Sequence, residues 1–175
     1  QLELTGQSNG VVLSPPGITA VYYTLTRGFE QMPGLSSAMA GVTRQMQCQN
    51  LAMAAWSNAQ WASAWLQMTM PFWSALTVAP LYKLGTMLFD RRRARWAVVV
   101  WALVPGMVFF QPRFNVFYPL MTLVMLIFLW RGLTTGRGGW IALAGFVLSV
   151  GLMLNLTLAP LGLLAGLIVI GERLR

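Results

Sequence analysis

The sequence predicts an all-α, polytopic integral membrane protein with four to five membrane spans and one outer amphipathic helix. Hydrophobic residues make up 57% of the 175 residues and charged residues only 9%, whereas a soluble domain averages about 25% charged residues. The apolar residues lie in long runs, separated by short segments rich in Arg, Pro or Gly. The surface of this chain is therefore suited to lipid.

The composition excludes several functional classes. There is no His, and Cys48 is the only Cys, which excludes an intrachain disulfide and imidazole ligation of a metal or haem. We therefore expect no metal and no cofactor, and no catalytic residue can be named. The net charge of +8 does not indicate nucleic-acid binding, because the basic residues lie at the ends of apolar runs and form no basic stripe.

Residues 1–57 are expected to form an extracytoplasmic loop that carries the amphipathic helix. The SPPG motif at residues 14–17 is typical of a helix start, since Pro is pre-organised for the first turn. Apolar residues then recur at steps of three or four within residues 18–32, namely Ile18, Val21, Tyr22, Leu25 and Phe29. A helix of about 15 residues reaches about 22 Å, less than the roughly 30 Å of a bilayer core. This helix should therefore lie at the interface.

Residues 58–175 are expected to form the transmembrane region. The first span covers residues 58–88, where Pro71 and Pro80 should kink the helix, and either neighbouring segments or the hydroxyls of Thr69 and Thr77 should satisfy the freed backbone. A fifth apolar segment, residues 159–171, is short for a span, so it is either buried among neighbours or continued beyond this chain. Between these lie three further spans, from Trp96 to about Phe110, from about Asn115 to Trp130, and from Trp140 to about Leu156.

The distribution of basic residues predicts the orientation. Nine of the 12 Lys and Arg residues fall on one side of the expected spans, at positions 83, 91, 92, 93, 95, 131, 137, 173 and 175. Three, Arg27, Arg44 and Arg113, fall on the other side. Basic residues are enriched in cytoplasmic loops. Residues 1–57 and the turns near residues 113 and 155 should therefore face outward, and we expect a protein of the bacterial inner (cell) membrane with its basic loops in the cytoplasm.

Residues 109–120, FFQPRFNVFYPL, hold the candidate site. In one interpretation this is an outward turn, in which Pro112 ends a helix, Asn115 caps the next one and Arg113 extends to the interface. In the other, Arg113 pairs with a phosphate, and Asn115 or Tyr118 donates a hydrogen bond to it. Tyr118 would then be a substrate-binding residue with Arg113 and Asn115.

Two other motifs have simpler interpretations. DRRRAR, residues 90–95, is expected to be a short cytoplasmic loop among lipid phosphates, with a specific anionic ligand as the alternative. Asn155-Leu156-Thr157 forms a glycosylation sequon. It lies at the end of an expected span, too near the bilayer to be modified.

Taken in order, SPPGITAVYYTLTR, YKLGTMLFDRR and PRFNVFYP resemble segments of the GT-C glycosyltransferases. The resemblance covers roughly residues 14–172 and is to the polyprenyl-phosphate-sugar-dependent group, which includes protein mannosyltransferases and aminoarabinose transferases. It implies transfer of a sugar from a lipid-phosphate carrier on the outer face, with Arg113 holding the phosphate. Asn115 stands where the family often carries an acid, and the family's main catalytic acid precedes the residues matched here. The resemblance is therefore to a central fragment.

Two functions remain open. The first is this glycosyltransferase, with membrane lipids and a polyprenyl-phosphate-linked sugar as its partners. The second is a non-catalytic integral membrane accessory subunit, packed against a larger respiratory or photosynthetic complex. Whether the chain is an enzyme stays undecided at this stage, because the expected catalytic acid is missing from it.

Overall fold

The computed structural model describes residues 16–45, 53, 55–104 and 114–173, and within these ranges the chain is all-α with no strand. The prediction of an all-α protein is thereby confirmed. The helices are α2 (Gly17–Glu30), α3 (Pro33–Gln45), α5 (Asn58–Ser63), α6 (Trp65–Met68), α7 (Met70–Leu76), α8 (Val78–Leu88), α9 (Arg91–Ala102), α11 (Tyr118–Thr135), α12 (Gly138–Leu154) and α13 (Ala159–Arg173), with 3₁₀ turns η1 (Phe114–Phe117) and η2 (Leu156–Leu158).

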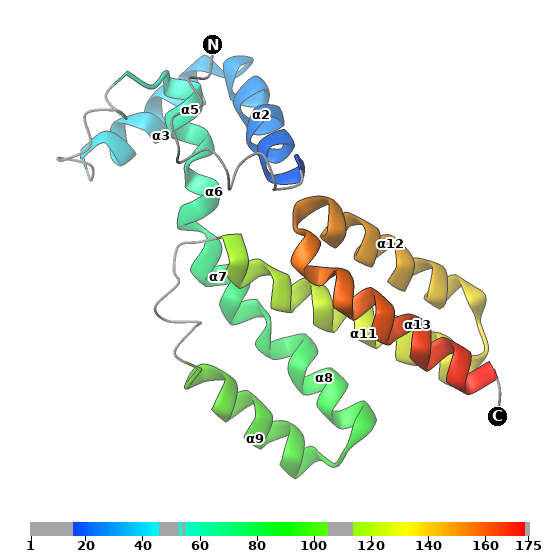
Figure 1. The fold of residues 1–175 in the computed structure, drawn as a ribbon. Coiled ribbons are helices and arrows are strands. Elements are labelled where there is room, and N and C mark those ends of the chain that lie inside the picture. Colours follow the sequence, from blue (N-terminus) through cyan, green and yellow to red (C-terminus); the bar gives the residue numbers. More distant parts are fainter. Residues whose placement is uncertain (1–15, 46–52, 54, 105–113, 174–175) are drawn as a thin grey trace, which may run out of the picture.

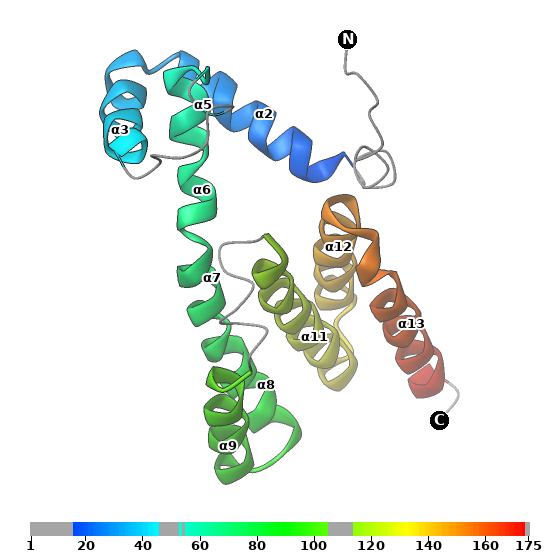
Figure 2. The same cartoon turned by 60° about the vertical axis from the view of Figure 1, so that its left-hand side comes forward.

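The helices form two groups joined by a bent stem. Helices α2, α3 and α5 pack against one another at one end of the molecule. The chain then descends through α6 and α7 to the α8–α9 hairpin, beside which α11, α12 and α13 lie (Figures 1 and 2). The largest helix interface is between α11 and α12. The expected outer helix is present as α2, which begins at Gly17 with Pro16 in the N-cap position, as the SPPG motif predicts.

Helix α3 is a finding that the apolar pattern did not predict. Its buried residues are small, Ser36, Ala40 and Thr43, and they recur at the helical spacing of four and three. The larger apolar residues Leu35 and Val42 are exposed instead. Because small side chains allow close helix packing, α3 contacts α5 along this face. A search for large apolar residues at helical spacing overlooks such a helix.

The expected first span, residues 58–88, is a series of short helices. The series is interrupted at Thr69 and Thr77, within the turns that precede Pro71 and Pro80, because a proline ring displaces the carbonyl one turn before it. The Thr69 hydroxyl donates to Leu66 O at 2.7 Å, and the Thr77 hydroxyl donates to Trp73 O at 3.1 Å. The interruptions near the two prolines were predicted, whereas the further break at Ala64 was not. The two hydroxyl bonds reach Leu66 O and Trp73 O, and not the carbonyls of Gln67 and Leu76, which the prolines free.

Among the described residues, one continuous helical stretch, Phe114–Thr135, is long and apolar enough by itself to cross a membrane. Two shorter apolar helical stretches, Gly138–Leu154 and Leu156–Glu172, follow it. The number of spans therefore stays a prediction. Helix α13 packs one face, with Leu161, Ala165 and Val169, against the core and exposes Leu163, Leu167 and Ile170 on another, so both interpretations of residues 159–171 stay open. Residues 105–110 of the expected second span lie outside the described residues.

The DRRRAR segment is helical, which corrects its interpretation as a loop. Helix α9 begins at Arg91, and Asp90 is its N-cap. The Asp90 carboxylate accepts a hydrogen bond from Arg93 N at 2.8 Å. It also lies 3.4 Å from Arg93 Nε, in an ion pair whose side chains are more than half exposed. An aspartate at a helix N-terminus satisfies a free N–H and offsets the positive end of the helix dipole, so the helix includes the arginines.

The Asp90 cap gives a first testable prediction. Asp90→Ala should destabilise the α8–α9 hairpin by about 1 kcal/mol, because a backbone N–H loses its acceptor. Asp90→Asn should retain most of that stability, since asparagine caps as well and an exposed ion pair contributes little. Thermal unfolding of the two variants in nanodiscs checks this. Equal loss in both variants would assign the effect to the charge and contradict the capping role.

The basic segments gather at one end of the helices. The α8–α9 turn, the α11–α12 turn and the end of α13 all lie toward the lower right in Figure 1 and at the bottom in Figure 2. These are the positions of Asp90–Arg95, of Arg137 and of Arg173. The start of α11 and the α12–η2 turn lie at the opposite ends of their helices. These basic segments therefore share one end of the helices, and the side of the membrane that this end faces stays a prediction.

Candidate functional site

Aromatic side chains of η1 and the start of α11 form the centre of the candidate site. We call Phe114, Phe117 and Tyr118 the aromatic corner. The Phe114 ring centroid lies 5.7 Å from that of Phe117 and 6.1 Å from that of Tyr118. Trp73 of α7 meets Phe117 edge to face at 5.4 Å. Such contacts are typical of stable aromatic packing, so the stem and the first turn of α11 hold each other in place.

The N-terminal end of α2 docks on this corner. Ile18 and Val21 pack against the buried cluster of Tyr118, Leu154 and Leu158. Gly17 lies so close to the end of α12 that a Cβ at this position would clash with the carbonyl oxygen of Met153. A glycine is therefore required here so that the backbone of α2 can approach the backbone of α12, in addition to starting the helix. Three segments far apart in the sequence, the start of α2 at Gly17, FNVFYP and NLT, thus meet at one place.

Asn155 shapes the third of these segments. Its side-chain oxygen accepts a hydrogen bond from Thr157 N at 3.0 Å and so caps η2. Tyr118, which is only 6% exposed, points its hydroxyl into the buried region. That hydroxyl makes no hydrogen bond of standard geometry to the described residues, and Asn155 is the polar side chain with which it interacts. Asn155 therefore has a structural role at the corner.

The three predicted site residues are placed differently. Asn115 lies in η1 and is exposed. It is not the cap of α11, as the turn interpretation had it, because Phe117 occupies that position without a capping side chain. Tyr118 is buried beneath the corner. Arg113 lies outside the described residues and directly precedes Phe114 in the sequence.

Acidic groups are few near this corner. On the same side of the described chain, the carboxylate of Glu30 is paired with Arg27 at 3.0 Å, and Glu3 lies outside the described residues. The described residues contain no group of three or more potential metal-ligating side chains. Among the described residues the corner therefore offers aromatic packing and one exposed amide, that of Asn115.

The comparison with known proteins agrees with the resemblance seen in the sequence. Residues 47–175, well over half of the chain, match the family of dolichyl-phosphate-mannose-protein mannosyltransferases. The match includes the stem, the aromatic corner and the α12–η2 turn, and begins after α3. No curated protein and no solved structure matches the chain, and nothing supports the alternative of an accessory subunit. The chain therefore belongs to the dolichyl-phosphate-mannose-protein mannosyltransferase family of GT-C-type membrane glycosyltransferases.

Proposed function

We propose that the protein acts in the transfer of a sugar from a polyprenyl-phosphate carrier, on the extracytoplasmic face of the membrane. The observation that supports this most is the convergence of α2, the aromatic corner and the Asn155 turn, because these are the three segments that the sequence assigns to the outer face. The family match supplies the reaction class. The basic turns lie at the other end of the helices from the corner (Figure 1). Because basic loops are typically cytoplasmic, this supports an outward orientation of the corner.

In this proposal Arg113 pairs with the carrier phosphate. A guanidinium presents several N–H donors in a planar fork that fits two phosphate oxygens. The exposed amide of Asn115 donates a further hydrogen bond. Tyr118, being buried, is a positioning residue that holds the corner in shape from beneath. As the glycosidic oxygen of the carrier leaves, these donors stabilise the negative charge that grows on the phosphate.

The acceptor must lose a proton to a base that the corner does not contain. Asn115 cannot take a proton, and Glu30 is occupied by Arg27. The base is therefore a carboxylate outside the described corner. This separates two tasks: the corner holds the leaving group, and another part of the protein activates the nucleophile.

The test is a transfer assay in membranes that contain the full protein. Radiolabelled mannosyl-phosphoryl-polyprenol is supplied from the outer leaflet, and label that appears in a non-lipid product is counted. We expect transfer above that of membranes lacking the protein. If the protein neither transfers label nor binds the carrier, the proposal is overturned and the accessory-subunit alternative gains support.

A further inference from the structure

A groove of about 550 Å³ lies between α2 and the α5–α6 segment. This volume is within the range of small-molecule sites, roughly 300–1,000 Å³. Its α2 wall consists of Thr19, Tyr22, Tyr23 and Thr26, which stand at the helical spacing of three and four residues and so share one face. The residues of α2 that dock on the aromatic corner, Ile18 and Val21, are not among those that line the groove.

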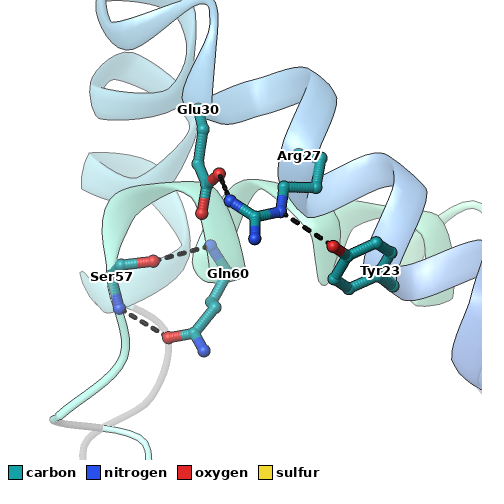
Figure 3. A network of polar contacts seen from close by, with 5 residues as sticks. All are labelled: Tyr23, Arg27, Glu30, Ser57 and Gln60. Carbon is teal, nitrogen blue, oxygen red and sulfur yellow. Dashed lines mark hydrogen bonds and ion pairs between the residues drawn. The ribbon is translucent and has the colours of Figure 1, made fainter.

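The two walls are held together by side-chain contacts. The Thr26 hydroxyl donates to Ser63 Oγ at 3.3 Å across the base of the groove. On the other wall, Ser57 and Gln60 form a capping box: Gln60 N donates to Ser57 Oγ at 3.2 Å, and Ser57 N donates to Gln60 Oε1 at 2.8 Å (Figure 3). The box fixes the Gln60 amide through its oxygen, which leaves its N–H groups as donors.

Aromatic side chains give the groove broad apolar surfaces. Tyr23 is 59% exposed, yet its position is fixed, because Arg27 Nε donates to its hydroxyl at 3.2 Å and Glu30 holds the same guanidinium (Figure 3). Trp56 lines the opposite wall and is tilted against Trp61 at 5.6 Å. An exposed aromatic ring that is held in place loses little conformational entropy when a ligand covers it.

Among the described residues that line the groove, none is charged. Arg27 lies at the edge, with its guanidinium carbon 5.3 Å from the centroid of the Tyr23 ring and an ion pair to Glu30. Because that carboxylate offsets its charge, an anion such as a phosphate would meet no unpaired cation among these residues. The polar groups that line it are instead amides and hydroxyls, including those of Gln60, Gln67 and Thr19.

Tyr22 contributes its ring and not its hydroxyl to the groove. The hydroxyl oxygen is closed to solvent and makes no hydrogen bond to the described residues. A ligand in the groove therefore cannot reach this oxygen, and its polar partners would be the amides and threonine hydroxyls of the lining.

We propose that this groove binds the ring of a neutral pyranose. Aromatic faces pack on the C–H surface of a sugar, while amides and hydroxyls bond its hydroxyl groups, and an uncharged lining suits a neutral ring. An extended peptide is the less suitable occupant, because both walls are helices and offer no row of free backbone groups. That the groove binds a sugar is inferred from its lining alone. That this sugar takes part in the transfer reaction rests on the proposed function. The sugar is either the head of the lipid-linked donor or part of a carbohydrate acceptor.

The test measures binding of methyl α-mannoside and methyl α-glucoside to the full protein in nanodiscs by saturation-transfer NMR. Tyr23→Ala and Gln67→Ala should each weaken binding at least about tenfold, a change of 1.4 kcal/mol. Both residues are exposed, so the fold should tolerate the changes. Tyr23→Phe keeps the ring but loses the hydroxyl that Arg27 holds, so it should weaken binding less than Tyr23→Ala does. Tyr82→Ala, on α8 and remote from the groove lining, is the control and should bind as the unaltered protein does.

The two sources of the sugar are separated by competition. If mannosyl-phosphoryl-polyprenol displaces the glycoside, the groove holds the donor head; if both bind together, it holds an acceptor sugar. Glycoside binding that is unchanged in Tyr23→Ala and Gln67→Ala overturns the groove, as does displacement by sugar-free polyprenyl phosphate or by a Ser/Thr peptide alone. If Tyr23→Ala still transfers sugar with unaltered KM values for donor and acceptor, the groove proposal is overturned and the proposed function stands. If the protein binds the glycoside in the groove but transfers no sugar, the groove proposal stands and the proposed function is overturned.

Discussion

Gly17→Ala is expected to detach the N-terminal end of α2 from the rest of the molecule. The added methyl group would meet the carbonyl of Met153 and lie 3.0 Å from Leu154 Cα, and both are backbone atoms that no rotamer change can move. Overpacking of this kind costs about 1–3 kcal/mol. Because Ile18 and Val21 dock beside the same contact, their packing on Tyr118 should be weakened too.

Gly28→Ala is the matched control for this prediction. Gly28 lies in the same helix, and a Cβ there would meet nothing within 4 Å. Replacement by alanine should be neutral or stabilise the helix by about 0.5–1 kcal/mol. Thermal unfolding in nanodiscs, monitored by tryptophan fluorescence, compares the two. A Gly17→Ala variant as stable as Gly28→Ala would contradict the close approach of α2 to the α12–η2 turn.

Arg113→Ala should weaken the binding of a polyprenyl-phosphate analogue at least tenfold. A charge-assisted contact to phosphate is worth about 1.5–3 kcal/mol, and no other cation is available from Phe114, Asn115 or Tyr118. Arg113→Lys should recover part of the affinity, since it keeps the charge but loses the two-pronged geometry. Binding is measured by titration of the analogue into the full protein in nanodiscs.

The control for Arg113 is Arg44→Ala. Arg44 is an exposed arginine expected on the same side, at the end of α3, where it donates to Trp56 O at 3.3 Å. Its removal should leave carrier binding unchanged. An equal loss of carrier affinity in both variants would show that any positive charge on this side has the same effect. Unchanged affinity in Arg113→Ala would contradict phosphate binding and support the interpretation in which Arg113 only extends to the membrane interface.

The sequence predicted the elements whose physical signal is local. The stripe from Ile18 to Phe29 predicted α2, and the prolines at 71 and 80 predicted the interruptions of the stem. Gly136, with a positive φ of 64°, ends α11 between Trp130 and Trp140, where the sequence predicted the break between two spans. Helix α3 was not predicted, because its buried face consists of Ser36, Ala40 and Thr43. Small residues bury little apolar area and carry little signal in a hydropathy pattern.

The candidate site could be predicted only in part, because it is made by contacts between distant segments. The FNVFYP motif was identified as part of an outward turn that holds the candidate site. That Tyr118 would be buried and Asn115 exposed depends on how α2 and the Asn155 turn pack around it. The role of Gly17 was hidden for the same reason, since a helix start explains a glycine after two prolines equally well. The arginines of DRRRAR were assigned to a loop, and a signal was present: an aspartate directly before the run is a typical N-cap.

The central claim is that the carrier phosphate binds at the aromatic corner. The most direct measurement is photocrosslinking of a polyprenyl-phosphate analogue, with the photoreactive group next to the phosphate, followed by mass spectrometry of the labelled peptides. The account predicts adducts within residues 113–118, lost in Arg113→Ala and retained in Arg44→Ala. Adducts confined to the basic α8–α9 turn at residues 83–95 would place the phosphate at the opposite end of the helices and contradict the account.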